Sequence, residues 1–391
     1  MLCAMLSATS ASRAQITAGD TVASRRLAPG VEYRHFIDKR GPFDVQLVRV
    51  NLRRPDIELR ALRAKGELRG RERPTEMIHR VEGGTVLAAV NADFFELKTG
   101  ENENNQVIAG EWWKGVKVTD SPYDTYDNTH IQFGVDATKH PVMDRFVFVG
   151  IALAHGVATP IITENFNPSG KPEGTALYTA RFGETTPQDT SRQTAEATLI
   201  AAGRRGDTLL YVRQGPVASA SGNPIPRDGA VLAAYGPGLR MKEVQSMADG
   251  DTVRVLLTTM PQMPSRHPPT LLVGGWPRIV KDGRNIAGEA PTVEGTISRN
   301  AELRHPRTSI GFSRDSSTLI LLTVDGRSEN SGGMTLVELA NMMRKLGAWQ
   351  AMNFDGGGST TMVIDGAVVN KPSDTTGERE VGNVLAVIKK R

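Results

Sequence analysis

One segment, residues 353–363, joins a carboxylate to three glycines and three hydroxyls. Asp355 follows a short apolar run, which predicts that its side chain is held at the end of a strand. The glycines at 356–358 allow backbone conformations that other residues avoid, and they let a ligand approach the main chain. Exposed amides in such a loop can bind an anion. A carboxylate beside such a loop favours chemistry on a phosphate or on the polar face of a sugar, although a hairpin entry without function remains the alternative.

Two more aspartates, Asp93 and Asp325, also follow apolar runs that resemble strands. Paired carboxylates serve glycoside hydrolysis, one as the acid and the other as the base or nucleophile. Asp325 could instead only form the turn that Gly326 and Arg327 continue. Asp93 and Asp325 are therefore candidate catalytic groups.

Arginine binds phosphate through two parallel hydrogen bonds and stays charged, so Arg307 and Arg379 are candidate phosphate ligands. Arg307 could also pair with a surface acid, which is a common arrangement. Trp276, in a glycine-rich turn, could stack on a sugar or could pack in the core. Sugar hydroxyls could bind to side-chain amides at Asn91, Asn353 and Asn383.

The composition excludes several function classes. The chain has 391 residues, 23% of them charged, and a net charge of only +4, which gives nucleic-acid binding little support. The single cysteine, Cys3, excludes an intrachain disulfide and a cysteine-based metal site. The histidines lack metal-ligand spacing, and no serine-hydrolase, P-loop or dinucleotide motif occurs. We therefore expect no cofactor and no metal.

The first residues, 1–14, are small and apolar and end close to the pattern of a signal cleavage site. The basic start and the long apolar run of a full signal peptide are missing. The segment is therefore interpreted either as a secretory leader shortened at its start or as a disordered tail. No stretch approaches the ~20 apolar residues of a membrane-spanning helix. We expect a periplasmic or secreted protein.

The unit from 318 to 355 has a clear pattern. Residues 318–324 form an apolar run typical of a buried strand, and Thr335 and Glu338 form a capping box that opens a helix. A second strand returns at 350–354. A connection of this length indicates a parallel crossover, which places Asp325 and Asp355 at the same edge of a sheet. Ligands bind at this edge in open α/β sheets.

The remaining pattern is mostly of strands. One lead-in strand is expected within 15–40, and a short helix capped by Thr75 within 75–81. Many short strands between 145 and 260 predict a largely antiparallel region. The fold class is therefore α+β, with mixed, largely antiparallel sheets, a few helices and the crossover near the C-terminus. We expect a leader at 1–25, a β segment at 26–74 packed on the main domain, and one domain at 75–391.

Six motifs in one order resemble the phosphodiester glycosidase family. They begin at Asn91, Val273, Arg304, Val324, Gly333 and Asn353, and the resemblance spans about residues 75 to 390. Each motif is weak alone, whereas the ordered set is fairly specific. The family often has glycine where Asp93 stands, and an extra acid there could assist catalysis or repel phosphate.

The resemblance implies cleavage of the glycosidic bond between a sugar and a phosphate. Asp355 is then the first candidate for assisting water or attacking the sugar, with Asp93 and Asp325 next. The alternative is a non-catalytic module that binds a cell-wall or exopolysaccharide phosphodiester. Substrate or phosphate would be bound by Asn91, Arg307, Thr308, Gly356, Gly357, Gly358, Ser359, Arg379 and Asn383.

Overall fold

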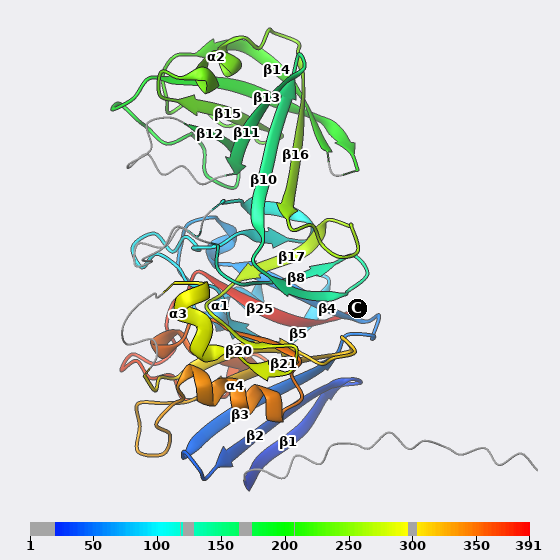
Figure 1. Ribbon diagram of the computed structural model, residues 1–391, viewed down its shortest axis with the longest axis vertical. Helices are drawn as coiled ribbons and strands as arrows, with labels where there is room; N and C mark the ends of the chain where they lie inside the picture. The colour runs from blue at the N-terminus through cyan, green and yellow to red at the C-terminus, as the bar shows by residue number, and fades with distance from the viewer. Residues whose placement is uncertain (1–19, 118, 120–128, 164–173, 207, 296–302) are drawn as a thin grey trace, which may run out of the picture.

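The computed structural model describes residues 20–117, 119, 129–163, 174–206, 208–295 and 303–391. Figure 1 shows two stacked lobes: a barrel above, and below it a lobe of sheets that carries both the first strands and the C-terminus. The expected leader lies outside the described residues, apart from its last six positions in strand β1. Sheets are largely antiparallel and helices few, as the sequence predicted; β11 and β12 form the one parallel pair among the described ladders.

An eight-stranded sheet forms the base of the lower lobe. The single lead-in strand expected within 15–40 is wrong, because Gly30 adopts a positive φ of 80° and folds the segment into a hairpin. In order, the strands are β1 (Asp20–Ala28), β2 (Val31–Asp38), β3 (Phe43–Asn51), β21 (Thr318–Val324), β20 (Arg307–Phe312), β22 (Gln350–Asn353), β18 (Arg278–Lys281) and β19 (Arg284–Asn285).

Both faces of this sheet are buried at β21. Leu319 and Leu321 of β21 point into the main core, whereas Ile320 and Leu322 pack with helix α4 (Leu336–Lys345) on the other face. The apolar run predicted as a buried strand is explained by this two-sided packing. The predicted capping box is confirmed: Thr335 accepts from the Glu338 amide, and the Glu338 side chain accepts from Thr335.

The crossover differs in one respect from the expectation. β21 and β22 run in the same direction, because each pairs antiparallel with β20. They do not pair with each other, since β20 lies between them. Their C-terminal ends, which lead to Asp325 and Asp355, therefore flank the start of β20, where Arg307 begins the strand.

Two five-stranded sheets cover the main core from the other side. A hairpin turn at Asp365 and Gly366 joins β23 and β24. The first sheet contains β24 (Ala367–Val368), β23 (Met362–Ile364), β5 (Gly84–Asn91), β25 (Asn383–Lys390) and β4 (Ile57–Arg63). The second contains β7 (Glu111–Lys114), β6 (Gln106–Ile108), β17 (Pro269–Gly274), β8 (Gln132–Asp136) and β9 (Pro141–Asp144).

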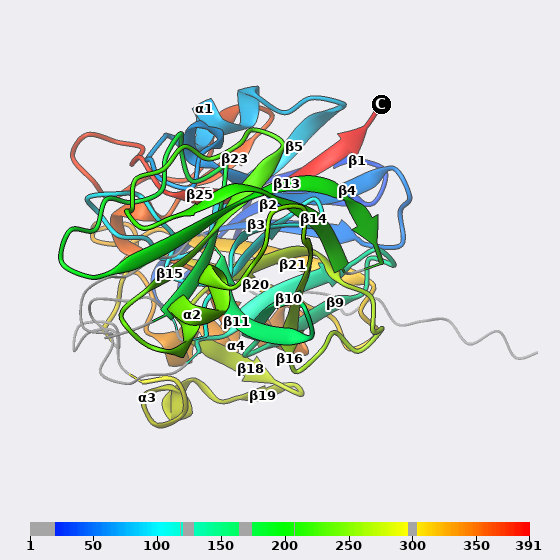
Figure 2. The same cartoon turned by 90° about the horizontal axis from the view of Figure 1, so that it is seen from above.

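The expected antiparallel region closes into a seven-stranded barrel, which the strand pattern did not predict. It is inserted between β9 and β17, and Figure 2 shows its strands stacked over the lower lobe. Its apolar core continues into the lower lobe through Trp112, whose ring lies 4.8 Å from that of Phe148. Its strands are β10 (Val147–Ala154), β11 (Val157–Thr163), β12 (Gly174–Thr179), β15 (Gly229–Tyr235), β13 (Thr194–Arg205), β14 (Thr208–Ala218) and β16 (Thr252–Met260).

The other helices are short: α1 (Pro74–His79), α2 (Leu239–Gln245) and α3 (Ala290–Val293). The expected cap at Thr75 is wrong, because α1 begins at Pro74 and Arg73 precedes it without a side-chain cap. Proline suits the first helical position, where no amide is needed. The Thr75 hydroxyl instead donates to Glu378 at 2.7 Å.

Candidate active site

Asn91, at the end of β5, joins the segments that form the site. Its Nδ2 donates to the main-chain oxygen of Asp355 at 2.7 Å, and its Oδ1 accepts from the Thr308 hydroxyl at 2.7 Å. The amide of Thr361 donates to the same Oδ1 at 3.1 Å. Asn91 and Thr308 are both buried. Their polar atoms hold the strand ends together, so their geometry suits positioning better than the binding of sugar hydroxyls.

Asp355 lies two residues after the end of β22 and remains partly exposed. Its amide donates to the oxygen of Ala92 at 2.8 Å, which ties it to the end of β5. Burial raises the pKa of the Asp355 carboxyl to about 6, against the lowering effects of the Ser359 hydroxyl and the Arg379 charge. A carboxyl with this pKa is mostly ionised at neutral pH and gains a proton in mild acid.

Each glycine of the loop leaves room for a neighbour. A side chain at Gly356 would meet the oxygen of Pro306 at 2.8 Å. Gly357 has a positive φ of 60°, and a side chain there would lie 3.1 Å from the Arg327 guanidinium. A side chain at Gly358 would overlap the guanidinium of Arg379. The three glycines therefore let a main chain and two cations approach one turn.

The amides of this loop are used differently from what the sequence suggested. The Gly356 amide donates to the Asp355 carboxylate at 2.8 Å, and the Gly357 amide donates to Pro306 at 2.9 Å. The Ser359 amide donates back to Gly356 at 3.1 Å. These groups stabilise the turn itself. Because these three amides bond within the protein, an anion at this loop would also need side-chain cations.

Two arginines supply such cations. Arg379 forms a two-bond pair with Asp374, at 2.6 and 2.9 Å, and its Nη1 lies 3.3 Å from the Ser359 hydroxyl. Arg327 is exposed and pairs with no described carboxylate; it contacts the Ser373 hydroxyl and the His305 ring, both at 3.4 Å. Arg327 therefore carries a positive charge beside the glycine loop that the described protein groups leave available.

Arg307 sits deeper, at the start of β20. Its Nε donates to the oxygen of Met334 at 2.9 Å, and its Nη2 to that of Leu303 at 2.8 Å. Burial lowers its pKa to about 10, so the group still carries its charge at neutral pH. Its main chain lies close to Gly356. Arg307 thus adds positive potential to the site while its donors hold neighbouring loops.

Asp93 lies two residues beyond Asn91 and is buried. Its carboxylate accepts from the Asn104 side chain at 2.7 Å, and its own amide donates to Asn383 at 3.0 Å. Burial raises its pKa to about 6, opposed chiefly by the Asn104 bonds and then by the charge of Lys114. The Asp355 amide donates to the main-chain oxygen of Ala92, the residue before Asp93. The main chains of the two aspartates therefore lie close together in space.

Asp325 ends β21 and holds a loop. The Lys371 amide donates to its carboxylate at 2.9 Å, and the Asn370 side chain at 3.1 Å. Burial raises its pKa to about 6, against these two bonds. The segment that it anchors leads on to Asp374 and Arg379. Asp325 therefore reaches the glycine loop through the segment it anchors, and no direct hydrogen bond joins it to Asp355.

Several buried polar atoms around these strand ends have no hydrogen-bond partner among the described residues. They include Asn383 Nδ2, Asn353 Oδ1, Thr360 Oγ1 and Thr361 Oγ1. Unpaired buried polar atoms are costly, so such a group favours contact with water or a ligand. Trp276 is fully buried and donates to the oxygen of Gly295 at 3.2 Å, which fits its core alternative.

The structure thus brings Asn91, Arg307 and the glycine loop together, with Asp355 at the centre. Sequence reasoning missed Arg327 as a site residue, because it was assigned to the turn that follows Asp325. Its signal was a basic residue in the turn that follows the buried strand β21. Among the described residues no group of histidine, cysteine and acidic side chains could hold a metal ion, and no described helix has the length and apolar content to span a bilayer.

Comparison with known proteins identifies the family that part of this chain resembles. Residues 201–388 match the model of the phosphodiester glycosidase family. The mouse N-acetylglucosamine-1-phosphodiester alpha-N-acetylglucosaminidase is 29% identical over 154 residues, which cover 38% of this chain. The human enzyme of the same name is 29% identical over 144 residues. The resemblance predicted from the motifs is therefore confirmed, although the match spans only 29% of the mouse enzyme's length.

Solved structures show the same fold. A hypothetical protein from Synechocystis superposes with a TM-score of 0.73 at 21% identity, covering 96% of this chain and 64% of that chain. The catalytic domain of the zebrafish N-acetylglucosamine-1-phosphodiester alpha-N-acetylglucosaminidase superposes with a TM-score of 0.50 at 16% identity, covering 96% and 89%. At these identities the likeness concerns the fold alone.

Proposed function

We propose that this chain is a hydrolase that cleaves the glycosidic bond of a sugar-1-phosphodiester, or of a related envelope or extracellular glycan. The observation that carries the proposal is Asp355, which sits on a glycine turn with the Arg327 and Arg379 guanidinium groups against it. The match of residues 201–388 to the phosphodiester glycosidase family supports the same reaction. Such a substrate suits a periplasmic or secreted protein, which we keep as part of the proposal.

The phosphate would bind on the cationic side of the glycine loop. Arg327 offers donors that no described acid neutralises, and Arg379 is held in place by Asp374. Guanidinium groups match phosphate oxygens in geometry as well as in charge. Positive charge fixed beside the departing phosphate stabilises the charge that develops as the bond breaks. Arg307 would support this potential from below, because it is charged and buried.

The reaction breaks the bond between the anomeric carbon and the phosphate oxygen, and water supplies the new hydroxyl of the sugar. The products are a free sugar and a phosphomonoester. A phosphomonoester has a second pKa of about 6, so it can leave without full protonation. The reaction therefore depends on one carboxylate that assists the attack, and it depends less on a strong acid.

Asp355 is the group we assign to that carboxylate role. It either removes a proton from the attacking water or attacks the anomeric carbon itself. The separation between carboxyl groups distinguishes these routes in glycosidases. Asp93 is the next candidate, since its raised pKa allows it to hold a proton in mild acid. Asp325 would act through the 370–379 segment as a positioning residue.

The test is sugar release from a synthetic N-acetylglucosamine-1-phosphodiester and from other glycosyl phosphodiesters. We expect turnover by the wild type and a loss of about 10³-fold or more with Asp355→Asn. The matched control is Asp365→Asn, an exposed aspartate in the β23–β24 hairpin. Normal turnover by Asp355→Asn would remove the assigned role. Saturable binding of the phosphodiesters without any turnover would indicate a binding module instead.

A further inference from the structure

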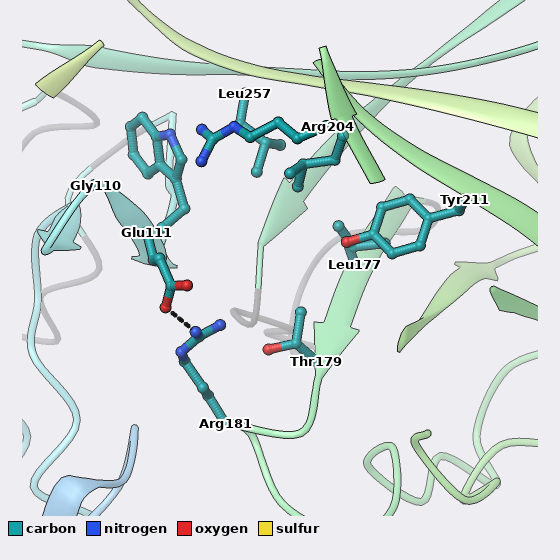
Figure 3. A pocket seen from close by; sticks show the side chains of 10 residues that line it. Gly110, Glu111, Leu177, Thr179, Arg181, Arg204, Tyr211 and Leu257 are labelled. Atoms are coloured by element: carbon teal, nitrogen blue, oxygen red, sulfur yellow. Dashed lines mark hydrogen bonds and ion pairs between the residues drawn. The ribbon is translucent and has the colours of Figure 1, made fainter. Parts of the chain in front are cut away.

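A hollow of about 180 Å³ lies where the barrel meets the lower lobe, away from the glycine loop. One wall comes from β7 and the other from barrel strands β12, β13, β14 and β16. None of the residues that line it belongs to the candidate active site. Figure 3 shows several polar groups converging on this space, although they come from segments distant in the sequence.

Arg204 gives the hollow a positive charge. Its side chain is exposed and extends across the space in Figure 3. Its Nε donates to the oxygen of Gly206 at 3.0 Å, and no described carboxylate pairs with it. The second arginine, Arg181, is already paired with Glu111 and stacks on Trp113 at 5.2 Å. One positive charge of the lining therefore remains unbalanced by a described acid.

The rest of the lining has one apolar side and one polar side. Leu177, Leu257 and Trp112 are buried and form apolar walls. The Thr179 and Tyr211 hydroxyls point into the same space. A sugar ring has this same division, with C–H groups on its face and hydroxyls on its edge. Pockets that combine apolar walls with a few convergent polar groups are typical of small-ligand sites.

We propose that this hollow binds one acidic sugar unit, such as a uronate, at a site separate from Asp355. The ring would rest on the apolar wall, and its hydroxyls would meet Thr179 and Tyr211. The acid group would bind the Arg204 guanidinium, which favours carboxylates through charge and through two parallel hydrogen bonds. The volume accommodates a single sugar unit rather than a long oligosaccharide. Such a site would hold an acidic glycan on the protein whether or not the bond is cleaved elsewhere.

The experiment titrates the full chain with D-glucuronate and, separately, with D-glucose. Tryptophan fluorescence reports binding, because Trp112 lines the hollow. We expect saturable glucuronate binding by the wild type and an affinity about tenfold lower with Arg204→Ala. The matched control is Arg205→Ala, the neighbouring exposed arginine, which does not line the hollow. D-glucose should bind more weakly than glucuronate.

Asp355→Asn separates this proposal from the proposed function. It should bind glucuronate like the wild type even where sugar release is lost. Equal glucuronate affinity in the wild type and Arg204→Ala would overturn the proposal, and so would the absence of saturable binding by the wild type. Equal affinity for glucose and glucuronate would overturn the assignment of an acidic ligand. Because Arg204 is exposed, its replacement should leave the fold intact, which circular dichroism checks.

Discussion

The barrel and the strand ends of the lower lobe bury different kinds of groups. Phe148, Leu199 and Leu232 belong to one apolar cluster inside the barrel. At the strand ends, by contrast, Asn91 and Asp93 are buried among polar groups that bond to one another. Apolar burial stabilises a fold roughly in proportion to its area, whereas buried polar groups gain little net stability but hold positions. The barrel is thus built for stability, and the strand ends for geometry.

The acids extend this contrast. Asp93, Asp325 and Asp355 all follow strands of the lower lobe, and burial raises the pKa of each to about 6. A protein that only needed stability would gain by replacing such carboxyls with neutral groups of the same shape. Three such carboxyls at strand ends of the lower lobe are typical of a functional site. The following variants test this division, beginning with the largest expected effect.

Leu232→Ala should cost about 2–5 kcal/mol of the free energy of unfolding, because it opens a cavity in the apolar barrel core. Chemical denaturation measures this loss. Below the unfolding midpoint, sugar release per folded molecule should stay close to that of the wild type. The control is Leu239→Ala, since Leu239 is 62% exposed. A catalytic defect larger than the loss of folded protein would contradict the separation of the two regions.

Gly358→Ala should instead lower activity more than it lowers stability. The added methyl overlaps Arg379 and Asp374 and must displace the pair. We expect sugar release to fall about tenfold to a hundredfold, since a cation moved by about 1 Å stabilises the reacting phosphate poorly. The control is Gly288→Ala, where an added methyl meets nothing within 4 Å and φ is not positive. Equal activity of the two variants would argue against a role for Arg379.

Asp325→Asn should have an intermediate effect. An asparagine can accept from one of the two donors, Lys371 or Asn370, but turns its own amide toward the other. We expect a loss of about 1–2 kcal/mol in unfolding free energy. We also expect a higher KM with a smaller change in kcat, because the anchored segment carries Arg379. A large fall in kcat at unchanged KM would instead assign Asp325 to the chemistry.

The pH dependence of stability tests the raised pKa of Asp355. Because the folded pKa of Asp355 is raised, the folded state binds its proton more tightly than the unfolded state does. Its contribution is fully present below pH 4, is lost as pH rises from about 4 to 6, and is then constant. The melting temperature of Asp355→Asn relative to the wild type should therefore rise across this window and level off above it. A difference independent of pH would contradict the raised pKa.

Activity should change with pH in the opposite direction from this stability contribution. If Asp355 acts as the ionised carboxylate, kcat/KM of the wild type should fall about tenfold per pH unit below about 6. The measurement is a pH profile of sugar release at low substrate concentration. A profile that stays flat down to pH 4 would show that no carboxyl with a pKa near 6 must be ionised.

Local patterns were sufficient for much of the fold. The capping box at Thr335 and the apolar strand at 318–324 depend on neighbours within a few residues, and each was predicted. The closure of the barrel was not predicted, because closure depends on pairing between strands far apart in sequence, such as β10 with β16. The hairpin within 20–38 was missed although Gly30 marked its turn.

By itself, the sequence determined which residues could do chemistry and the family they resemble: Asp355, its glycines and the arginines were named from residue types and order. The tertiary structure decided how these groups are used. Asn91 meets Asp355 across 264 residues, Arg327 rather than the loop amides offers the available donors, and Asp325 anchors a neighbouring segment. The physical reason is that a hydrogen bond depends on distance and direction in space. Residue type states only what a side chain can donate or accept, and the packing of distant strands chooses its partner.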